Sequence, residues 1–245
     1  MKRKIKNIYM DNRDVELLHY LFKVKVASCQ QIHRDIYNDI CFGAAGNRIR
    51  RLQDNKFIEI GHNRLIHHGK RTVWLKKPGF EEFVRSGNEM RIELKSDSIN
   101  HDLVLVDIRR KFLDAPTTKR YRTENEIQTW GGSEKQLNSD AIVSMQIQTV
   151  ILDIPIEYER SPKLKQRFEN MVKRYYQKSD YPLVFVLAET QAAIEAIKHC
   201  EQELFPRKKT KFFYSSVDEL LSTESPKLFN CHGSFFDLMQ RTDDV

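Results

Sequence analysis

Closely spaced cysteines are missing from this sequence. Its four cysteines are Cys29, Cys41, Cys200 and Cys231, and no two of them form a Cys-x-x-Cys pair. This spacing argues against a zinc knuckle and against a disulfide framework. The neighbouring pair Cys231-His232 supplies too few ligands for a metal site of its own. We therefore expect the four thiols to be reduced and buried.

Glycine, proline and long apolar runs are also scarce. With 9 Gly, 7 Pro, 31% charged and 40% hydrophobic residues, the composition is that of an ordinary soluble globular protein. No apolar run approaches the roughly 18 to 20 residues that span a bilayer, and no apolar segment follows the basic N-terminus as in a signal peptide. We expect a cytoplasmic protein without a membrane partner, long enough for one large domain or two ordinary ones.

Acidic residues are underrepresented only in the first third of the chain. Residues 1–90 contain 18 Lys and Arg against 10 Asp and Glu, a net charge of +8, whereas residues 91–245 contain 23 against 24, a net charge of −1. Positive charge concentrated on a small unit favours a polyanionic partner, most often nucleic acid, because neutralised phosphates release counterions. A solubilising surface is the alternative, and the motifs must decide between the two.

The pattern of the first third predicts three helices followed by a hairpin. Apolar residues recur at helical spacing after the N-cap candidates Asp11 and Asn12, Ser28 caps a second helix, and residues 44–54 form a third. A short strand at residues 57–60 precedes a loop and a second extended segment. This order is typical of a winged helix-turn-helix, in which the third helix enters the major groove and the hairpin lies over the flanking backbone.

The exposed face of the third helix and the basic hairpin supply the candidate DNA contacts. They are Asn47, Arg48, Arg50, Arg51, Lys70 and Arg71. Arginines on an exposed helix are often merely solvated, but here the helix order, the hairpin and the charge bias agree. Double-stranded DNA is therefore the expected partner, with a protein-contact role as the alternative. A relaxase-type histidine cluster is disfavoured, because the consecutive His67 and His68 would point to opposite faces of a strand.

From residue 96 onward the elements alternate between helix and strand. A polar stretch at residues 88–97 places the boundary near residue 95, which gives domains of 1–95 and 96–245. The second domain is expected to contain a helix, strands at 121–128, 140–148 and 150–159, a helix at 162–178, and then strand 183–187, helix 192–200 and strand 212–214. This order predicts an α/β arrangement with a mixed sheet flanked by helices, so the chain as a whole is α+β.

Three carboxylates are expected to meet at the ends of two central strands. Alternation along residues 150–159 places Glu157 and Glu159 on one face, and Asp140 opens the neighbouring strand. Carboxylates so close raise one another's pKa values unless a cation offsets their charge. Because Mg²⁺ prefers oxygen ligands, it is the expected counter-charge, with Mn²⁺ as the substitute.

Asp140 followed one strand later by Glu157-Tyr158-Glu159 resembles the PD-(D/E)xK nuclease core. A winged helix joined to such a domain, with His101-Asp102-Leu103 and the run from Ile156 to Ser161 before a helix containing Tyr175, resembles the replication-relaxation proteins of plasmids and conjugative elements. The resemblance implies a metal held by Asp140 and Glu157, and Glu124 on the first strand is the candidate to complete its ligand shell. The resemblance also implies DNA processing in replication or conjugative mobilisation, with relaxosome or replication proteins as partners. A homodimer is expected because winged helices often read paired half-sites.

The motif departs from the nuclease pattern at one position that matters. Glu159 stands where the pattern has lysine, and Ser139 replaces the proline before Asp140. Without a cation the site lacks a group to position or deprotonate the attacking water, and Lys163 or Lys165 are the candidates to supply it. Three hypotheses stay open: an active endonuclease or nickase of plasmids, an inert nuclease-like domain in a binding protein such as a transcriptional regulator, and a restriction-type or transposon-end endonuclease.

Overall fold

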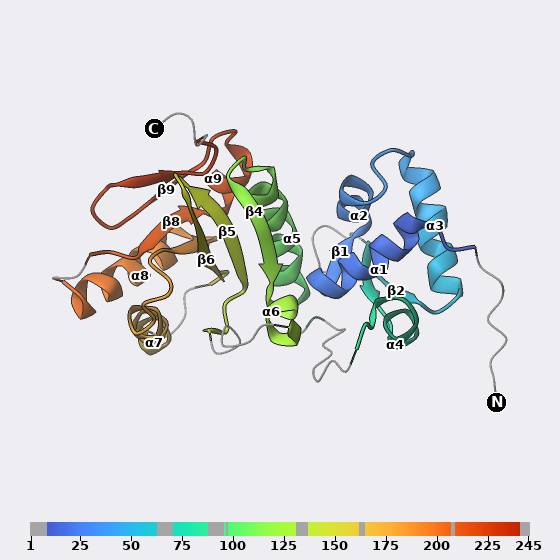
Figure 1. Cartoon of the computed structure of the whole chain (residues 1–245), viewed down its shortest axis with the longest axis horizontal. Helices are drawn as coiled ribbons and strands as arrows, with labels where there is room; N and C mark the ends of the chain where they lie inside the picture. Colours follow the sequence, from blue (N-terminus) through green and yellow to red (C-terminus); the bar gives the residue numbers. More distant parts are fainter. Residues whose placement is uncertain are drawn as a thin grey trace. The chain divides into compact units, whose positions relative to one another are not determined.

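The chain is an α+β protein, in agreement with the expected class. The computed structural model describes residues 9–62, 71–87, 96, 98–130, 137–161, 165–206 and 209–240. The chain divides into two compact units (Figure 1), one of Met1–Val106 with Gln128–Trp130 and one of Asp107–Ile127 with Gly131–Val245. No helix in the described ranges is long and apolar enough to cross a membrane.

The first unit combines helices with one small antiparallel sheet. Its elements are α1 (Asn12–Val24), β1 (Val26–Ser28), α2 (Cys29–Asp35), α3 (Phe42–Asp54), β2 (Ile58–His62), β3 (Arg71–Leu75), α4 (Lys77–Gly79) and the π-helical turn η2 (Phe80–Val84). β3 is the central strand, with β1 and β2 antiparallel on either side of it. The short β1 thus joins the hairpin that follows α3.

Capping residues explain where the first two helices begin. The carboxylate of Asp11 accepts the N–H of Asp14 at 2.9 Å, and the carboxylate of Asp14 accepts the N–H of Asp11 at 3.4 Å. Ser28 and Gln31 form the same reciprocal pair at the start of α2. Each pair satisfies two backbone donors that a helix end leaves open. The caps predicted at Asp11 and Ser28 are confirmed.

The second unit is built on a mixed sheet. Its elements are α5 (Ile99–Asp114, whose first residues belong to the first unit), β4 (Thr118–Thr123), α6 (Glu124–Trp130), β5 (Ala141–Ile147), β6 (Val150–Glu159), α7 (Lys165–Tyr176), β7 (Val184–Ala188), α8 (Gln191–Leu204), β8 (Phe212–Ser216), α9 (Val217–Ser222), β9 (Lys227–Phe229) and β10 (Phe235–Asp237). In the described residues the sheet has seven strands in the order β10-β9-β8-β7-β6-β5-β4. β6, β7 and β8 are parallel, and the other neighbours are antiparallel.

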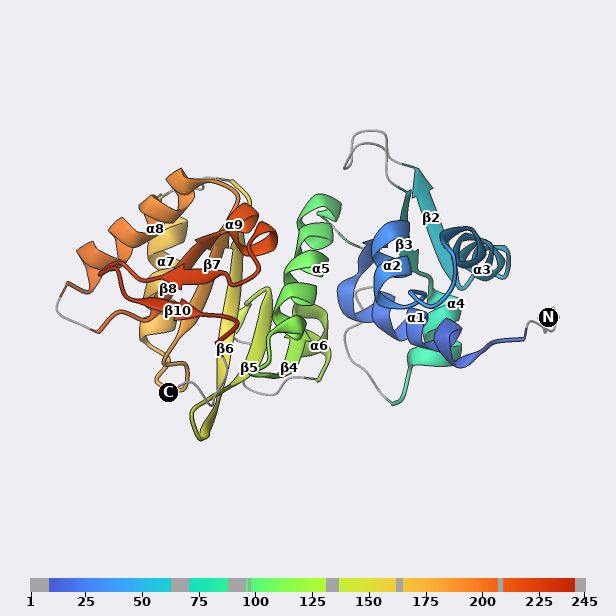
Figure 2. The same ribbon diagram turned by 90° about the horizontal axis from the view of Figure 1, so that it is seen from above.

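Helices cover both faces of this sheet (Figures 1 and 2). On one face, Phe112 of α5 stacks on Phe185 of β7, with ring centroids 5.7 Å apart. On the other face, α7 and α8 share a core with Val184 and Val186 of the same strand. Successive side chains of a strand point to opposite faces, so a single strand serves both cores. The expected mixed sheet between helices is confirmed.

One segment differs from the sequence prediction. We expected a strand through residues 121–128, but β4 ends at Thr123 and α6 begins at Glu124. The carboxylate of Glu126 accepts the N–H of Thr123 at 3.1 Å, and the hydroxyl of Thr123 accepts the N–H of Glu126 at 3.4 Å. Thr-x-x-Glu is a capping box, and it starts a helix here. Glu124 therefore lies in the first turn of a helix and not on a strand.

Candidate functional site

One buried carboxylate fastens α3 to α1. Asp14 is fully buried and accepts hydrogen bonds from the Tyr37 hydroxyl at 2.9 Å and from the Arg48 guanidinium at 3.0 and 2.8 Å. Arg51 adds a longer contact of 3.3 Å to the same carboxylate and donates to the carbonyl of Tyr9 at 2.7 Å. The hydrogen bond with Asp14 raises the pKa of Arg48 above the ordinary arginine value. Arg48 therefore holds the two helices together, and its guanidinium is turned toward α1 rather than outward.

The outward face of α3 carries a different set of residues from the one expected. Gly43, Asn47 and Arg50 are exposed, and Gly46 is partly exposed. Their spacing of three, four and seven residues places them on one side of the helix. Within the part of the chain that the structure describes, the side chains of Asn47 and Arg50 have no hydrogen-bond or ion-pair partner. Of the four predicted contacts on this helix, these two face solvent without an internal role.

The two glycines of this face are not required by the packing of the unit. A Cβ atom added at Gly43 or at Gly46 would meet nothing within 4 Å. Among the described residues, nothing therefore packs against this side of α3 at Gly43 or Gly46. Of the two DNA contacts predicted on the hairpin, Arg71 is exposed at the start of β3, and Lys70 lies outside the described residues.

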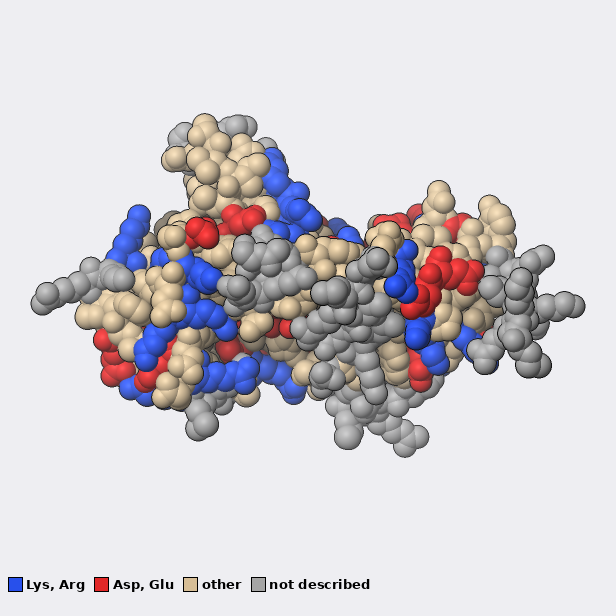
Figure 3. Space-filling model, turned by 60° about the horizontal axis from the view of Figure 1, so that its bottom comes forward, with Lys and Arg blue, Asp and Glu red and all other residues tan. Residues whose placement is uncertain are grey.

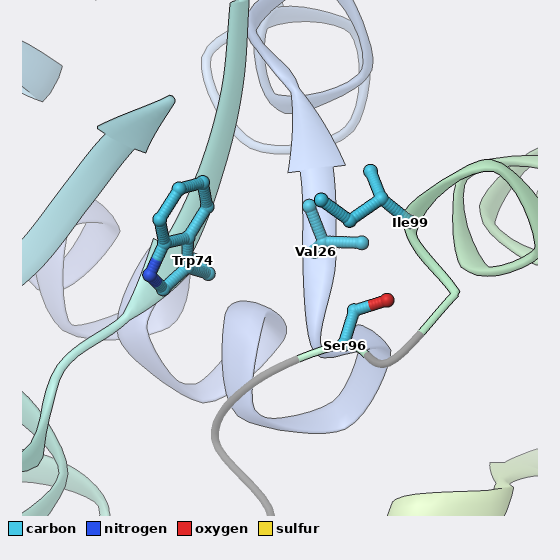
Figure 4. A pocket seen from close by; sticks show the side chains of 4 residues that line it. All are labelled: Val26, Trp74, Ser96 and Ile99. Carbon is cyan, nitrogen blue, oxygen red and sulfur yellow. The ribbon is translucent and has the colours of Figure 1, made fainter. Parts of the chain in front are cut away.

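The unit also contains one small cavity, shown in Figure 4, lined by Val26, Trp74, Ser96 and Ile99. Its volume is about 20 Å³, which is room for about one water molecule. It is therefore too small for a cofactor or substrate.

In the second unit, β5 and β6 bring Asp140 and Glu157 together as the strand pattern predicts. Ala141 lies opposite Ile156 in the antiparallel pair, and the carboxylate of Asp140 accepts the N–H of Tyr158 at 2.7 Å. Glu157 and Glu159 lie on the face that α7 and α8 cover, because their neighbours in β7 are Val186 and Ala188. The three acids therefore belong to one face of the sheet.

Two side chains of α7 lie on Glu157. Nη2 of Arg174 donates to Oε1 of Glu157 at 2.9 Å, and the hydroxyl of Tyr175 donates to the same oxygen. Glu157 is only 7% exposed. Burial raises its pKa to about 8, the negative charge of Asp140 adds to the effect, and Arg174 and Tyr175 oppose it. Glu157 therefore holds its proton to a higher pH than an exposed glutamate does.

Lys165, one of the two lysines expected to supply a cation to the acids, is paired with another residue. Nζ of Lys165 is 2.8 Å from the carboxylate of Glu203 on α8, and Lys163 lies outside the described residues. Glu124 meets Asp140 through the backbone, where its N–H donates to the Asp140 carbonyl at 2.9 Å. Across the described ranges, no three His, Cys, Asp or Glu side chains form a group that could hold a metal ion.

A hard cation would take oxygen ligands from Asp140 and Glu157, and at Glu157 it would compete with Arg174 and Tyr175, which both donate to Oε1. The positive charge beside Glu157 comes from Arg174, which the sequence analysis did not name.

Glu201 is another buried carboxylate of the second unit, and the sequence analysis did not name it. Glu201 of α8 is 2% exposed and accepts the hydroxyls of Tyr176, Thr210 and Tyr214 at 2.7, 2.7 and 3.0 Å, together with the N–H of Lys211 at 3.1 Å. These bonds satisfy the carboxylate within the fold and fasten α8 to β8. The helical spacing from Ile194 through Ile197 to Glu201 places this acid on the apolar side of its helix, and that signal was available in the sequence.

The fold and the site define a two-unit α+β protein with an open helix face on one unit and a covered group of acids on the other. Comparisons of the chain with protein-family models, with curated proteins and with solved structures gave no match in any of the three.

Proposed function

We propose that the chain is a sequence-specific double-stranded DNA-binding protein and that its first unit is a winged helix. The element order α1-β1-α2-α3-β2-β3, with β1 paired to β3, supports this assignment. In a winged helix the third helix enters the major groove. The net charge of +8 on residues 1–90 favours a polyanionic partner.

The outward face of α3 is the observation that carries the proposal. Glycine inside a helix costs roughly 0.5 to 1 kcal/mol relative to alanine, yet the packing gives no reason for Gly43 or Gly46. A close approach by a partner's surface explains both, because a side chain there would hold the partner away. Asn47 and Arg50 stand beside them, and these residue types make paired hydrogen bonds to adenine and guanine edges.

The second unit is proposed to have a nuclease-like fold that serves in binding or assembly. Its order α5-β4-α6-β5-β6-α7-β7 contains the helix, strands, helix and strand of the expected PD-(D/E)xK core, with α6 as an additional helix between β4 and β5. Metal-dependent nicking is the second candidate, favoured by the common face of Asp140, Glu157 and Glu159. Replication or mobilisation of a plasmid or integrated element is the setting that the resemblance suggests, and a symmetric dimer reading paired half-sites is the assembly.

Binding of α3 variants to DNA tests the proposal. The preferred site is first selected from random duplexes with the wild-type protein, and affinity is then measured by fluorescence anisotropy at fixed salt. Asn47→Ala and Arg50→Ala should each weaken specific binding by about 1 to 3 kcal/mol. Gly46→Ala should stabilise the free unit by about 0.5 to 1 kcal/mol and still weaken binding, because the added methyl group blocks close approach.

The control is Arg85→Ala, which removes an exposed arginine that pairs with Glu81 on η2. It should leave the affinity for the selected site unchanged. An equal loss on every duplex would assign Arg50 to the phosphates rather than to base edges. Unchanged affinity in all three α3 variants would remove α3 as the DNA-reading helix, and with it the proposed function.

A further inference from the structure

The β9–β10 hairpin presents two aromatic rings to solvent at one edge of the sheet. Phe229 is 38% exposed and Phe235 is 53% exposed, and the two residues are paired across the strands with ring centroids 6.0 Å apart. They continue the row that begins with Tyr214 on β8, because Tyr214 is the register partner of Phe229. Tyr214 is buried, and Lys198 of α8 lies over its ring. The covered face of the sheet therefore continues beyond α8 as an uncovered aromatic surface.

The turn that carries this surface is firmly built. Oδ1 of Asn230 accepts the N–H groups of His232 and Ser234 at 2.9 and 3.0 Å, and the N–H of Asn230 donates to the Ser234 carbonyl at 2.8 Å. Gly233 has φ of +83°, a conformation that side chains disfavour. The backbone that carries the two rings is thus ordered before any partner binds, which reduces the entropy lost on binding.

A lysine of β9 lies beside the rings. Asp237 of β10 is its register partner and accepts the hydroxyl of Ser225 at 2.9 Å and the N–H of Met239 at 3.0 Å. Nζ of Lys227 lies 4.5 Å from the centroid of the Phe235 ring, and Lys227 shares the face of Phe229 because the two are separated by one residue on β9. Exposed aromatic rings with a neighbouring cation match the two parts of a nucleotide, a flat base and an anionic phosphate. Base stacking on an aromatic side chain contributes about 1 to 3 kcal/mol per base and tolerates any sequence.

The area of the surface decides between this partner and a second copy of the chain. A phenylalanine side chain buries at most about 250 Å², whereas a stable protein interface buries about 800 Å² on each partner. Two partly exposed rings are far too small for a stable dimer contact, but they match two successive bases. In Figure 1 the hairpin is the red end of the sheet, at the opposite edge from β4.

We propose that Phe229 and Phe235 form a stacking platform for unpaired bases of single-stranded DNA, with Lys227 beside the phosphate backbone. The platform shares its class of partner with the proposed function, but it uses another unit and another state of the DNA. It gives the second unit a task of its own: holding a strand that has been separated from its complement.

Affinity for a short fluorescein-labelled oligothymidine, measured by anisotropy on the full chain, tests this inference. Phe229→Ala and Phe235→Ala should each weaken binding by about 5- to 150-fold, which corresponds to about 1 to 3 kcal/mol per stacked base. Phe235→Leu keeps apolar area but removes the flat ring, and it should weaken binding to a similar extent. Val150→Ala is the matched control, since Val150 is 54% exposed on another hairpin, and it should bind as the wild type does.

Duplex binding separates this inference from the proposed function. Arg50→Ala should retain oligothymidine binding, and Phe235→Ala should retain duplex binding. Oligothymidine binding by a wild-type protein that ignores duplex DNA would sink the proposed function and leave the platform standing. The platform is overturned if the phenylalanine variants bind oligothymidine like the wild type, or if Phe235→Leu retains full affinity. It is also overturned if the variants change only the oligomeric state in sedimentation, which would assign the rings to a contact between copies.

Discussion

Replacement of Glu157 by glutamine should remove a pH dependence from the local stability of the second unit. In the folded chain, burial and the charge of Asp140 raise the pKa of Glu157 to about 8. A carboxyl with a raised pKa binds its proton more tightly when folded than when unfolded. Its favourable contribution is therefore fully present below about pH 4.5 and is lost as the pH rises toward 8. Glutamine is neutral at every pH and still accepts hydrogen bonds from Arg174 and Tyr175 through its oxygen.

The structure sets an upper limit on this effect. The ordinary glutamate value of 4.5 and the raised value of about 8 differ by about 3.5. At about 1.4 kcal/mol for each pH unit, the difference is about 5 kcal/mol in the free energy of opening. Glu157 is 7% exposed, so solvent screens little of it. The value of about 8 already includes the contacts with Arg174 and Tyr175, which favour the charged form of Glu157.

Amide hydrogen exchange of peptides from β6 and α7 measures the free energy of local opening around Glu157. Wild type and Glu157→Gln are compared at the same pH, because the intrinsic exchange rate then cancels. The two proteins should be about equally protected near pH 5, and the variant should become the better protected one as the pH approaches 8. Glu195→Gln is the control, since Glu195 is exposed and paired with Lys198. If the difference in amide protection between wild type and Glu157→Gln stays constant from pH 5 to 8, the reasoning is refuted.

Two further predictions follow from the same contacts. Arg48→Met should destabilise the first unit by up to about 3 to 5 kcal/mol in urea denaturation, because it removes the closer of the two guanidinium groups on the buried carboxylate of Asp14, whereas Arg50→Met should change stability little. Supercoiled DNA should stay intact with wild-type protein, both with Mg²⁺ or Mn²⁺ and with chelator. Metal-dependent nicking that disappears in Asp140→Ala would instead establish the nuclease.

Local patterns were sufficient for much of the fold. The caps at Asp11 and Ser28 and the alternation along β6 depend on neighbours a few residues away, and these predictions were confirmed. The start of α6 is equally local, because Thr123 and Glu126 form a capping box that the sequence contains as Thr-x-x-Glu. The strand expected through residues 121–128 was wrong beyond Thr123 for this reason.

The orientation of charged side chains was harder to predict, because it depends on contacts between distant elements. Arg48 belongs to the exposed side of α3 by spacing alone, yet it turns toward Asp14, which lies 34 residues earlier in the chain. Arg174 is on the basic side of α7 by the same criterion, yet it reaches Glu157 on β6. In both cases a buried acid attracts an arginine from a neighbouring helix, because a buried charge is costly unless it is paired.

The identity of the cation beside Glu157 bears directly on the choice between cutting and binding. Lysine in the nuclease pattern can position or deprotonate water, whereas the guanidinium of Arg174 stays protonated in proteins and cannot accept a proton. Arg174 thus neutralises the acids without supplying a base, and Tyr175 occupies the same carboxylate oxygen. The bonds from Arg174 and Tyr175 to Oε1 of Glu157 therefore join α7 to β6, and the expected result of the nicking assay rests on this use of the carboxylate within the fold.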